Sequence, residues 1–271
     1  MQLQNARQRF EKQGIKVAAI SYDSAAILKD FAERHKIDFP LLADPDSKLI
    51  RSFNVLNAEA TGMTKGMAYP GYFYLDSHGV IRETFFDSNY LNRYTANNVI
   101  GKLFPELTEE VASTVEAPHM QLTLKQSDRI AAPGSHASLI AEVQLPPDVH
   151  VYSPGVQGYR PVQLRMEASS EFEPAALAYP QSKILYLKAI KEQVPVFEGK
   201  FRIVQDVKVA ATREFIGSLG AEGRTISVKG ELQYQACDTR VCYPPASVPV
   251  EWQLQVLPLD RERSPEAIRH K

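Results

Sequence analysis

The spacing of apolar residues changes once along this chain, and that change limits the folds open to it. Up to about residue 104, some segments carry apolar residues at helical spacing and others form short apolar runs. Beyond residue 119, apolar residues fall on alternate positions in one segment after another. A period of about 3.6 is typical of a helix with one buried face, and a period of two is typical of a half-buried strand. The 271 residues therefore predict an α/β domain followed by an all-β domain.

The first part combines helical and strand-like segments. The expected helices cover residues 2–13, a segment capped by Ser24, a short segment after Asp44-Pro45-Asp46, and residues 95–104. The expected strands cover residues 16–22, 39–43, 72–76 and 80–86, the last two as a hairpin. Ile27, Leu28 and Phe31 should form the buried stripe of the second helix. This order predicts a layered α/β domain with one mixed sheet.

An acidic segment bounded by prolines separates the two parts. We interpret residues 105–118 as a linker between an α/β domain at 1–104 and a β-domain at 119–258, with a charged tail at 259–271. Four segments of the β-domain alternate apolar and polar residues, which is typical of strands in a β-sandwich. They run from Ala137 to Leu145, Phe201 to Val209, Ile226 to Ala236 and Val248 to Val256.

Charge and composition argue against several classes of partner. The formal net charge is −1, so no excess of positive charge favours nucleic acid or an anionic membrane. No apolar run approaches the roughly 20 residues that cross a bilayer, and the first ten residues lack the apolar core of a signal peptide. The six histidines are scattered without metal-ligand spacing, so we expect no metal and no cofactor.

The only two cysteines, Cys237 and Cys242, lie at the expected tip of a hairpin between strands 225–237 and 246–256. Residues facing each other in an antiparallel pair have Cα atoms about 4.5–5.5 Å apart, which suits a disulfide. No His or Cys lies near the pair in sequence, which disfavours zinc. A structural disulfide, two inert thiols and a redox-active pair remain as interpretations. So small a ring would stabilise the fold by only roughly 2 kcal/mol, which favours the redox-active pair.

Three segments of the β-domain carry a family resemblance. LQYQACDTRVCYPP at 232–245 closely resembles the active-site hairpin of the N-terminal domain of the thiol:disulfide interchange protein DsbD. HVYSP at 150–154 resembles the aromatic strand beside the cysteines in that family, and VFEGKF at 196–201 resembles its cap loop. The resemblance covers residues 118–258 or so and implies an immunoglobulin-like sandwich.

The same resemblance implies roles for individual residues and a class of partner. Cys242, which precedes Tyr-Pro-Pro, would form mixed disulfides with partners, and Cys237 would resolve them. The other implied site residues are His150, Tyr152 and Tyr243 around the pair, and Phe197 as an aromatic lid over the disulfide. The implied partners are thioredoxin-like proteins with a CxxC motif, and the implied compartment is the periplasm.

The first part is similar to a second redox family, the peroxiredoxin-like AhpC/TSA (redoxin) branch of the thioredoxin fold. Residues 18–57 and 69–86 carry this resemblance, and Pro70 stands where that fold has a cis-proline. The family's catalytic cysteine begins its first helix, after a central strand. Here that helix begins at residues 1–3, and the first hundred residues contain no cysteine. We therefore expect a truncated domain without thiol peroxidase activity.

Together these features predict a thiol:disulfide oxidoreductase that relays electrons through Cys237 and Cys242. One alternative is an antioxidant peroxiredoxin-like enzyme whose catalytic cysteine is missing from this chain. The other is a non-catalytic binding module in which the disulfide is structural.

Overall fold

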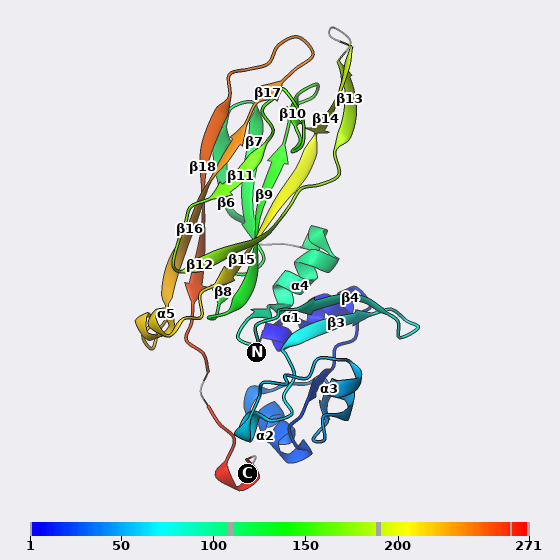
Figure 1. Ribbon diagram of the computed structural model, residues 1–271, viewed down its shortest axis with the longest axis vertical. Coiled ribbons are helices and arrows are strands. Elements are labelled where there is room, and N and C mark those ends of the chain that lie inside the picture. Colours follow the sequence, from blue (N-terminus) through cyan, green and yellow to red (C-terminus); the bar gives the residue numbers. More distant parts are fainter. Residues whose placement is uncertain (1, 108–110, 188–190, 261, 270–271) are drawn as a thin grey trace. The chain divides into compact units, whose positions relative to one another are not determined.

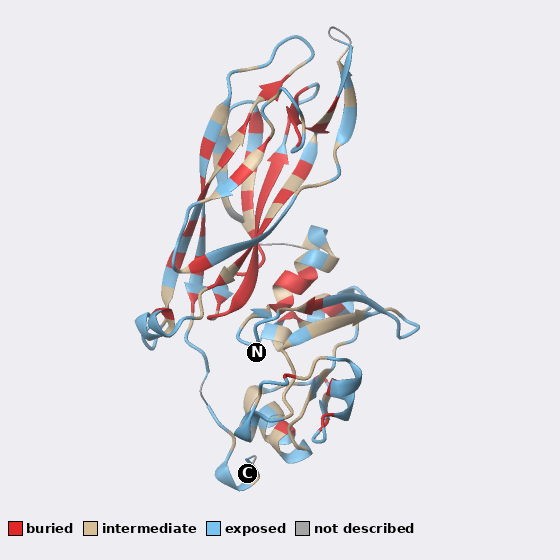
Figure 2. Cartoon of the chain, viewed as in Figure 1, coloured by how far each residue is buried: buried red, intermediate tan, exposed pale blue. Residues whose placement is uncertain are grey.

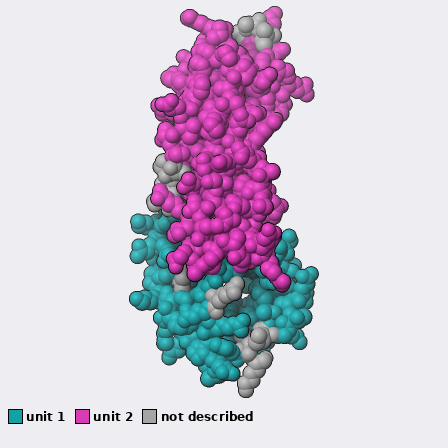
Figure 3. Space-filling model, turned by 90° about the vertical axis from the view of Figure 1, so that its left-hand side faces the viewer, with its two compact units in different colours: residues 1–105, 259–271 teal, residues 106–258 magenta. Residues whose placement is uncertain are grey.

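The computed structural model describes residues 2–107, 111–187, 191–260 and 262–269. It divides into two compact units, which are coloured separately in Figure 3. The first unit consists of residues 1–105 together with 259–271, and the second unit consists of residues 106–258. None of the helices in these ranges has the length and apolar character of a membrane-spanning segment.

The first unit contains helices and strands in the expected order. Its helices are α1 (Gln2–Lys12), α2 (Ala25–His35), α3 (Lys48–Ser52) and α4 (Ala96–Leu103), with short 3₁₀ turns η1 (Gly62–Thr64) and η3 (Glu266–Ile268). A further 3₁₀ turn, η2 (Pro105–Leu107), spans the boundary between the two units in the sequence. Its strands are β1 (Ala19–Ser21), β2 (Leu41–Ala43), β3 (Gly71–Leu75), β4 (Ile81–Phe86) and β5 (Arg93–Tyr94). Ser24 caps α2 by accepting a hydrogen bond from the Ile27 backbone N–H at 3.4 Å.

Strands β1 to β4 form two small sheets instead of the expected mixed sheet. β1 pairs in parallel with β2, and β3 pairs antiparallel with β4. Among the described residues, no strand pairs with both β1–β2 and β3–β4, so nothing joins them into one sheet. Burial is correspondingly incomplete: Phe31, expected on the buried stripe of α2, is 37% exposed.

Pro70, which immediately precedes β3, has a trans peptide bond. The described part of the chain contains no cis peptide bond, so the expected cis-proline is wrong here. The trans isomer of an X–Pro bond is favoured by about 0.5–1 kcal/mol, and cis persists only where the surrounding structure imposes it.

The second unit is a β-sandwich with a smaller sheet at one end (Figure 1). One large sheet has the order β12-β15-β9-β7-β6, the other β11-β16-β18-β8, and the small sheet β13-β14-β10-β17. The strands are β6 (Val111–Ala117), β7 (Met120–Gln126), β8 (Ile130–Ala131), β9 (Ser135–Gln144), β10 (His150–Tyr152), β11 (Gln163–Met166), β12 (Phe172–Ala178), β13 (Lys183–Leu187), β14 (Glu192–Glu198), β15 (Lys200–Val209), β16 (Arg224–Tyr234), β17 (Ala236–Cys237) and β18 (Ala246–Val256). The short helix α5 (Arg213–Ser218) precedes β16.

Strand β6 replaces most of the expected linker. Residues 111–117 pair antiparallel with β7, ending with Ala117 opposite Met120. Val115 and Ala117 pack against the sandwich core, although residues 105–118 as a whole are acidic and weakly apolar. An edge strand needs only one packed face, so this modest apolar content is enough to hold it in the sheet.

The long hairpin of β16 and β18 positions the cysteines. Its register runs from Arg224 opposite Val256 to Tyr234 opposite Ala246, and buried and exposed residues alternate along both strands (Figure 2). After Gln235 the chain leaves this sheet, and β17 pairs with β10 in the small sheet. The hairpin whose alternation was predicted from sequence therefore ends next to the cysteine pair.

Candidate active site at the disulfide hairpin

Cys237 and Cys242 form a disulfide at the tip where the chain turns back toward β18. Their Cα atoms are 4.0 Å apart and the two residues face each other as an antiparallel bridge. Two backbone hydrogen bonds frame the tip: Tyr243 N–H donates to the Ala236 carbonyl and Asp238 N–H donates to the Val241 carbonyl, each at 2.9 Å. The hairpin-tip position predicted for the cysteines is where the structure has them.

The two sulfurs differ in their access to solvent. Cys237 is 1% exposed and packs with Tyr152, Val194 and Val196, whereas Cys242 is exposed. Disulfide exchange requires a thiolate to approach one sulfur directly, so access decides which sulfur is attacked. By this criterion, Cys242 is the more accessible residue of the pair.

Tyr152 places a hydroxyl beside both sulfurs. Its oxygen lies 3.7 Å from Cys237 Sγ and 3.8 Å from Cys242 Sγ. The sulfurs of a disulfide carry no hydrogen, so the hydroxyl is the donor in this weak contact. Burial, and then the Glu192 carboxylate, raises the pKa of Tyr152 above its ordinary value. The hydroxyl therefore keeps its proton at neutral pH and remains a donor.

A second tyrosine supports the first. The Tyr159 ring stacks on the Tyr152 ring, with centroids 4.3 Å apart. The Tyr159 hydroxyl donates to Glu192 Oε2 at 2.7 Å, and this hydrogen bond, together with burial, raises the pKa of Tyr159 to about 12. The hydroxyl of Tyr159 is thus directed at a carboxylate and not at the sulfurs.

His150 is the cross-strand partner of Cys237. It lies opposite Cys237 in the β10–β17 pair and opposite Glu198 in the β10–β14 pair, so the three side chains share one face of the small sheet. His150 is 4% exposed, meets the Tyr152 ring edge-on at 5.5 Å, and its Nε2 is buried without a hydrogen-bond partner. Burial lowers the pKa of His150, while the Glu198 and Asp238 carboxylates oppose that shift.

Asp238 holds the hairpin tip in place. Its Oδ1 accepts hydrogen bonds from the backbone N–H of Arg240 at 2.7 Å and of Val241 at 2.8 Å, and its Oδ2 accepts from the Tyr243 hydroxyl at 2.7 Å. The Val241 N–H, the Tyr243 hydroxyl and the Arg240 N–H, in that order, lower the pKa of Asp238 to about 2. The Tyr243 ring in turn stacks on His119 at 3.7 Å, which ties the tip to the turn between β6 and β7.

Phe197 does not lie over the disulfide. Residues of β14 alternate between the two faces of the small sheet, and Val194 and Val196 pack on the face that carries Cys237. Phe197 points to the other face, where it is 3% exposed in the sandwich core and its ring lies 4.9 Å from that of Phe201. The lid role expected for Phe197 is therefore wrong in this structure.

The structure thus gathers most of the expected site residues and adds others. Cys237, Cys242, His150, Tyr152 and Tyr243 lie together, whereas Pro70 belongs to the first unit. The residues missed from sequence are Asp238, Tyr159, Glu192, His119, Val194 and Val196. Asp238 had a usable signal, because Asp accepts hydrogen bonds from backbone N–H groups two or three residues ahead in a tight turn.

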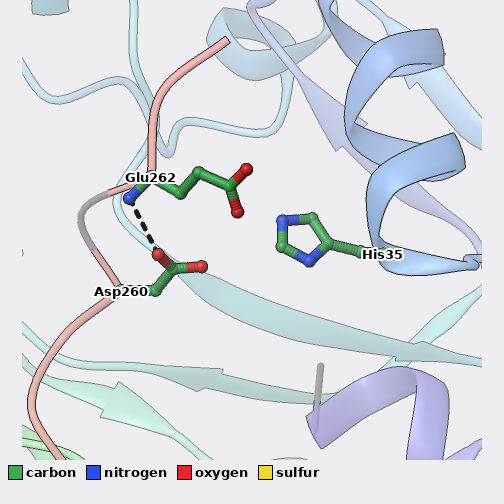
Figure 4. Close-up of side chains that lie close together, drawn as sticks. All are labelled: His35, Asp260 and Glu262. Carbon is green, nitrogen blue, oxygen red and sulfur yellow. Dashed lines mark hydrogen bonds between the residues drawn. The ribbon is translucent and has the colours of Figure 1, made fainter.

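A cluster of His35, Asp260 and Glu262 lies in the first unit (Figure 4). One possible ligand atom from each lies within 4.8 Å of the others. The carboxylates already have partners: Glu262 pairs with Arg34 at 3.1 Å, and Asp260 Oδ1 accepts from the Glu262 N–H at 2.8 Å. These contacts account for the cluster, and we assign no metal to it.

Comparison with known proteins finds one family match within each of the two units. Residues 1–84 match the model of the AhpC/TSA family, and residues 121–251 match that of the thiol:disulfide interchange protein DsbD, N-terminal. Alkyl hydroperoxide reductase C of Staphylococcus haemolyticus is 27% identical over 105 residues, which are 37% of this chain and 52% of that protein. The chain therefore spans about half the length of this curated relative.

Two solved structures resemble the chain at low sequence identity. The N-terminal periplasmic domain of ScsB from Proteus mirabilis has 13% identity and a TM-score of 0.34, covering 53% of this chain and 50% of that one. The Neisseria meningitidis DsbD N-terminal domain in the reduced form has 13% identity and a TM-score of 0.29, covering 44% of this chain and 78% of that one.

Proposed function

We propose that Cys237 and Cys242 relay electrons to or from thioredoxin-like CxxC proteins, in a chain whose residues 1–84 match the AhpC/TSA family and whose residues 121–251 match the DsbD N-terminal family. Thiol–disulfide exchange fits both the match to the DsbD N-terminal family and the disulfide itself. The observation that carries the proposal is the difference in exposure between the sulfurs. Cys242 is exposed, whereas Cys237 is 1% exposed.

The exchange proceeds in two steps. A partner thiolate attacks Cys242 Sγ, a bond forms between that sulfur and the partner, and the Cys237–Cys242 bond breaks with its electron pair left on Cys237 Sγ. The second thiolate of the partner then attacks the partner's own first sulfur and releases Cys242 as a thiolate. The partner becomes a disulfide and Cys237 and Cys242 become a reduced pair, so two electrons move. In the reverse direction Cys242 attacks a partner disulfide and Cys237 resolves the mixed disulfide.

The site residues have distinct parts in this exchange. The five-residue separation of Cys237 and Cys242 keeps the resolving thiol near the mixed disulfide at high effective concentration. The Tyr152 hydroxyl lies within reach of a thiolate on either sulfur. Asp238 keeps the tip ordered through its three hydrogen bonds.

A trapping experiment tests the proposal and the order of the two sulfurs. A thioredoxin whose CxxC motif retains only its first cysteine, carried as a mixed disulfide with thionitrobenzoate, is offered to each reduced single variant. Cys237→Ser should displace thionitrobenzoate and accumulate a covalent complex on a non-reducing gel, because the exposed Cys242 attacks and no thiol resolves the product.

Cys242→Ser is the matched variant and should trap little or no partner, because Cys237 is buried. Trapping by Cys242→Ser instead would reverse the two roles. If neither variant traps the partner while both remain folded, the disulfide is structural and the oxidoreductase proposal fails.

A further inference from the structure

His150 has a buried nitrogen for which the disulfide form offers no partner. Its Nε2 makes no hydrogen bond, although His150 is 4% exposed. Nearly all buried polar atoms in folded proteins are hydrogen-bonded, so an exception at a reactive site calls for an explanation. We look for the explanation in the cross-strand neighbour of His150.

The residue opposite His150 is Cys237, the buried sulfur of the pair. Side chains directly opposite each other in an antiparallel pair share a face and have Cβ atoms about 4.5–5.5 Å apart. The His150 ring and Cys237 Sγ therefore extend from neighbouring positions on the same face of the small sheet. In the disulfide Sγ carries no hydrogen, so it has no proton to offer Nε2; a Cys237 thiol would have one.

We propose that His150 accepts the proton of the Cys237 thiol when Cys237 resolves a mixed disulfide at Cys242, and returns that proton when the disulfide is reduced. This inference rests on the proposed function and assigns His150 as a catalytic base within it. It explains why Nε2 has no partner in the oxidised form, because its partner exists only in the reduced form.

The proposed step balances in atoms and electrons. Nε2 of the neutral imidazole takes the proton from Cys237 Sγ, whose electron pair forms the bond to Cys242 Sγ. The bond between Cys242 and the partner sulfur breaks, and the partner leaves as a thiolate. Cys237 and Cys242 are oxidised to the disulfide, and the partner sulfur is reduced. The imidazolium then releases its proton to solvent, which protonates the partner thiolate.

The charges around His150 suit both states of the ring. Burial lowers the pKa of His150, so the imidazole is neutral near pH 7 and free to act as a base. Once protonated, the ring faces the Glu198 carboxylate from β14 and the Asp238 carboxylate beyond β17, both of which raise the pKa. Glu198 also pairs with Lys183 of β13 at 3.7 Å. Tyr152 on the same strand has a raised pKa and holds its own proton, so it cannot serve as the base.

The step can be timed on the full chain with dithiobis-nitrobenzoate. The reduced protein releases one thionitrobenzoate when Cys242 attacks the reagent and a second when Cys237 resolves the product. His150→Gln should slow the second release at least 10-fold near pH 7, since positioned bases contribute about 10²–10⁴-fold. Its rate should recover as the pH rises toward the ordinary thiol pKa, about 8.5. The first release should be unchanged.

His78→Gln is the matched control, because His78 is an exposed histidine in the turn between β3 and β4, in the unit that holds no cysteine. It should leave both releases unchanged. A His150→Gln protein that resolves as fast as the wild type overturns the inference and leaves the proposed function intact. A wild type that makes the first release but never the second overturns the proposed function, and this inference with it.

A measurement on the wild type covers the case in which His150→Gln does not fold. The imidazole nitrogen resonances of His150 are followed by NMR in the oxidised and reduced proteins across the pH range of the histidine titration. The Nε2 resonance should move on reduction, as expected for a nitrogen that gains a hydrogen bond, and the apparent pKa should change with redox state. Identical spectra and titrations in the two forms overturn the inference.

Discussion

Two stacked tyrosines beside the disulfide use their hydroxyls differently. The Tyr152 hydroxyl lies 3.7 Å and 3.8 Å from the two sulfurs, whereas the Tyr159 hydroxyl donates to Glu192. A hydrogen bond to a thiolate is charge-assisted and roughly twice as strong as one to a neutral acceptor. The Tyr152 hydroxyl should therefore stabilise the reduced, ionised pair more than the disulfide.

Tyr152→Phe should make the disulfide harder to reduce. We expect the equilibrium constant for reduction by glutathione near pH 8.5 to fall by up to about 10-fold, which is roughly 30 mV in the reduction potential. Tyr159→Phe is the control, because it keeps the stacked ring and removes a hydroxyl that contacts no sulfur. A Tyr152→Phe protein as easily reduced as the control would show that the hydroxyl has no role in the redox equilibrium.

The residues that surround the disulfide could be predicted from sequence where they belong to a local motif. Cys237, Cys242 and Tyr243 lie within one short segment, and His150 and Tyr152 within another, so recognising two segments was enough. Tyr159 and Glu192 are 33 residues apart and meet only because the fold brings them together. No local sequence pattern predicts such a contact. Asp238 did have a local signal in the turn that it begins.

Strand β14 shows why a motif match does not settle which way a side chain points. The segment containing Phe197 resembles a cap loop, but in this chain residues 192–198 form a regular strand whose side chains alternate between faces. A difference of one position moves a side chain to the opposite face of a sheet. Val196 consequently lies on the face of Cys237, and Phe197 lies in the core.

Phe197→Ala should therefore act on stability and not on access to the disulfide. Removing a buried Phe typically costs about 3–5 kcal/mol, and we expect a loss of that size in the free energy of unfolding measured in urea. Reduction of the folded variant by glutathione should proceed at the wild-type rate. Ile184→Ala, at a position that is 65% exposed, is the control and should change neither quantity by much. Faster reduction with little loss of stability would restore the lid interpretation.

The other elements could be predicted where the sequence distinguishes their buried positions from their exposed positions. The register of β16 and β18 follows from uninterrupted alternation, which leaves only one face for the core. The four glutamates of residues 105–118 favour a linker, but only Glu116 lies in β6, where Val115 and Ala117 pack against the core. In the first unit the helices and hairpin were predicted correctly, but the joining of strands into one sheet depends on long-range pairing that local pattern does not contain.

At the scale of the whole molecule, both cysteines belong to the second unit. The matched redoxin segment, residues 1–84, contains no cysteine, and both cysteines lie in the second unit. Thiol peroxidase chemistry needs a thiolate as its nucleophile. We therefore infer that, within this chain, thiol chemistry belongs to the second unit, which holds both cysteines.

This inference predicts that the purified 271-residue protein does not turn over hydrogen peroxide with dithiothreitol above the rate of a Cys237→Ser/Cys242→Ser double variant. The comparison is decisive because the double variant keeps the first unit unchanged and removes both thiols of the chain. Peroxide can oxidise an exposed thiolate slowly at any surface, so turnover, and not a single oxidation event, is the quantity to measure. Sustained turnover by the wild type alone would assign peroxidase activity to Cys237 and Cys242. Equal background in both proteins, together with trapping of a thioredoxin partner at Cys242, would mean that the chain's thiols serve exchange with other proteins and not the reduction of peroxide.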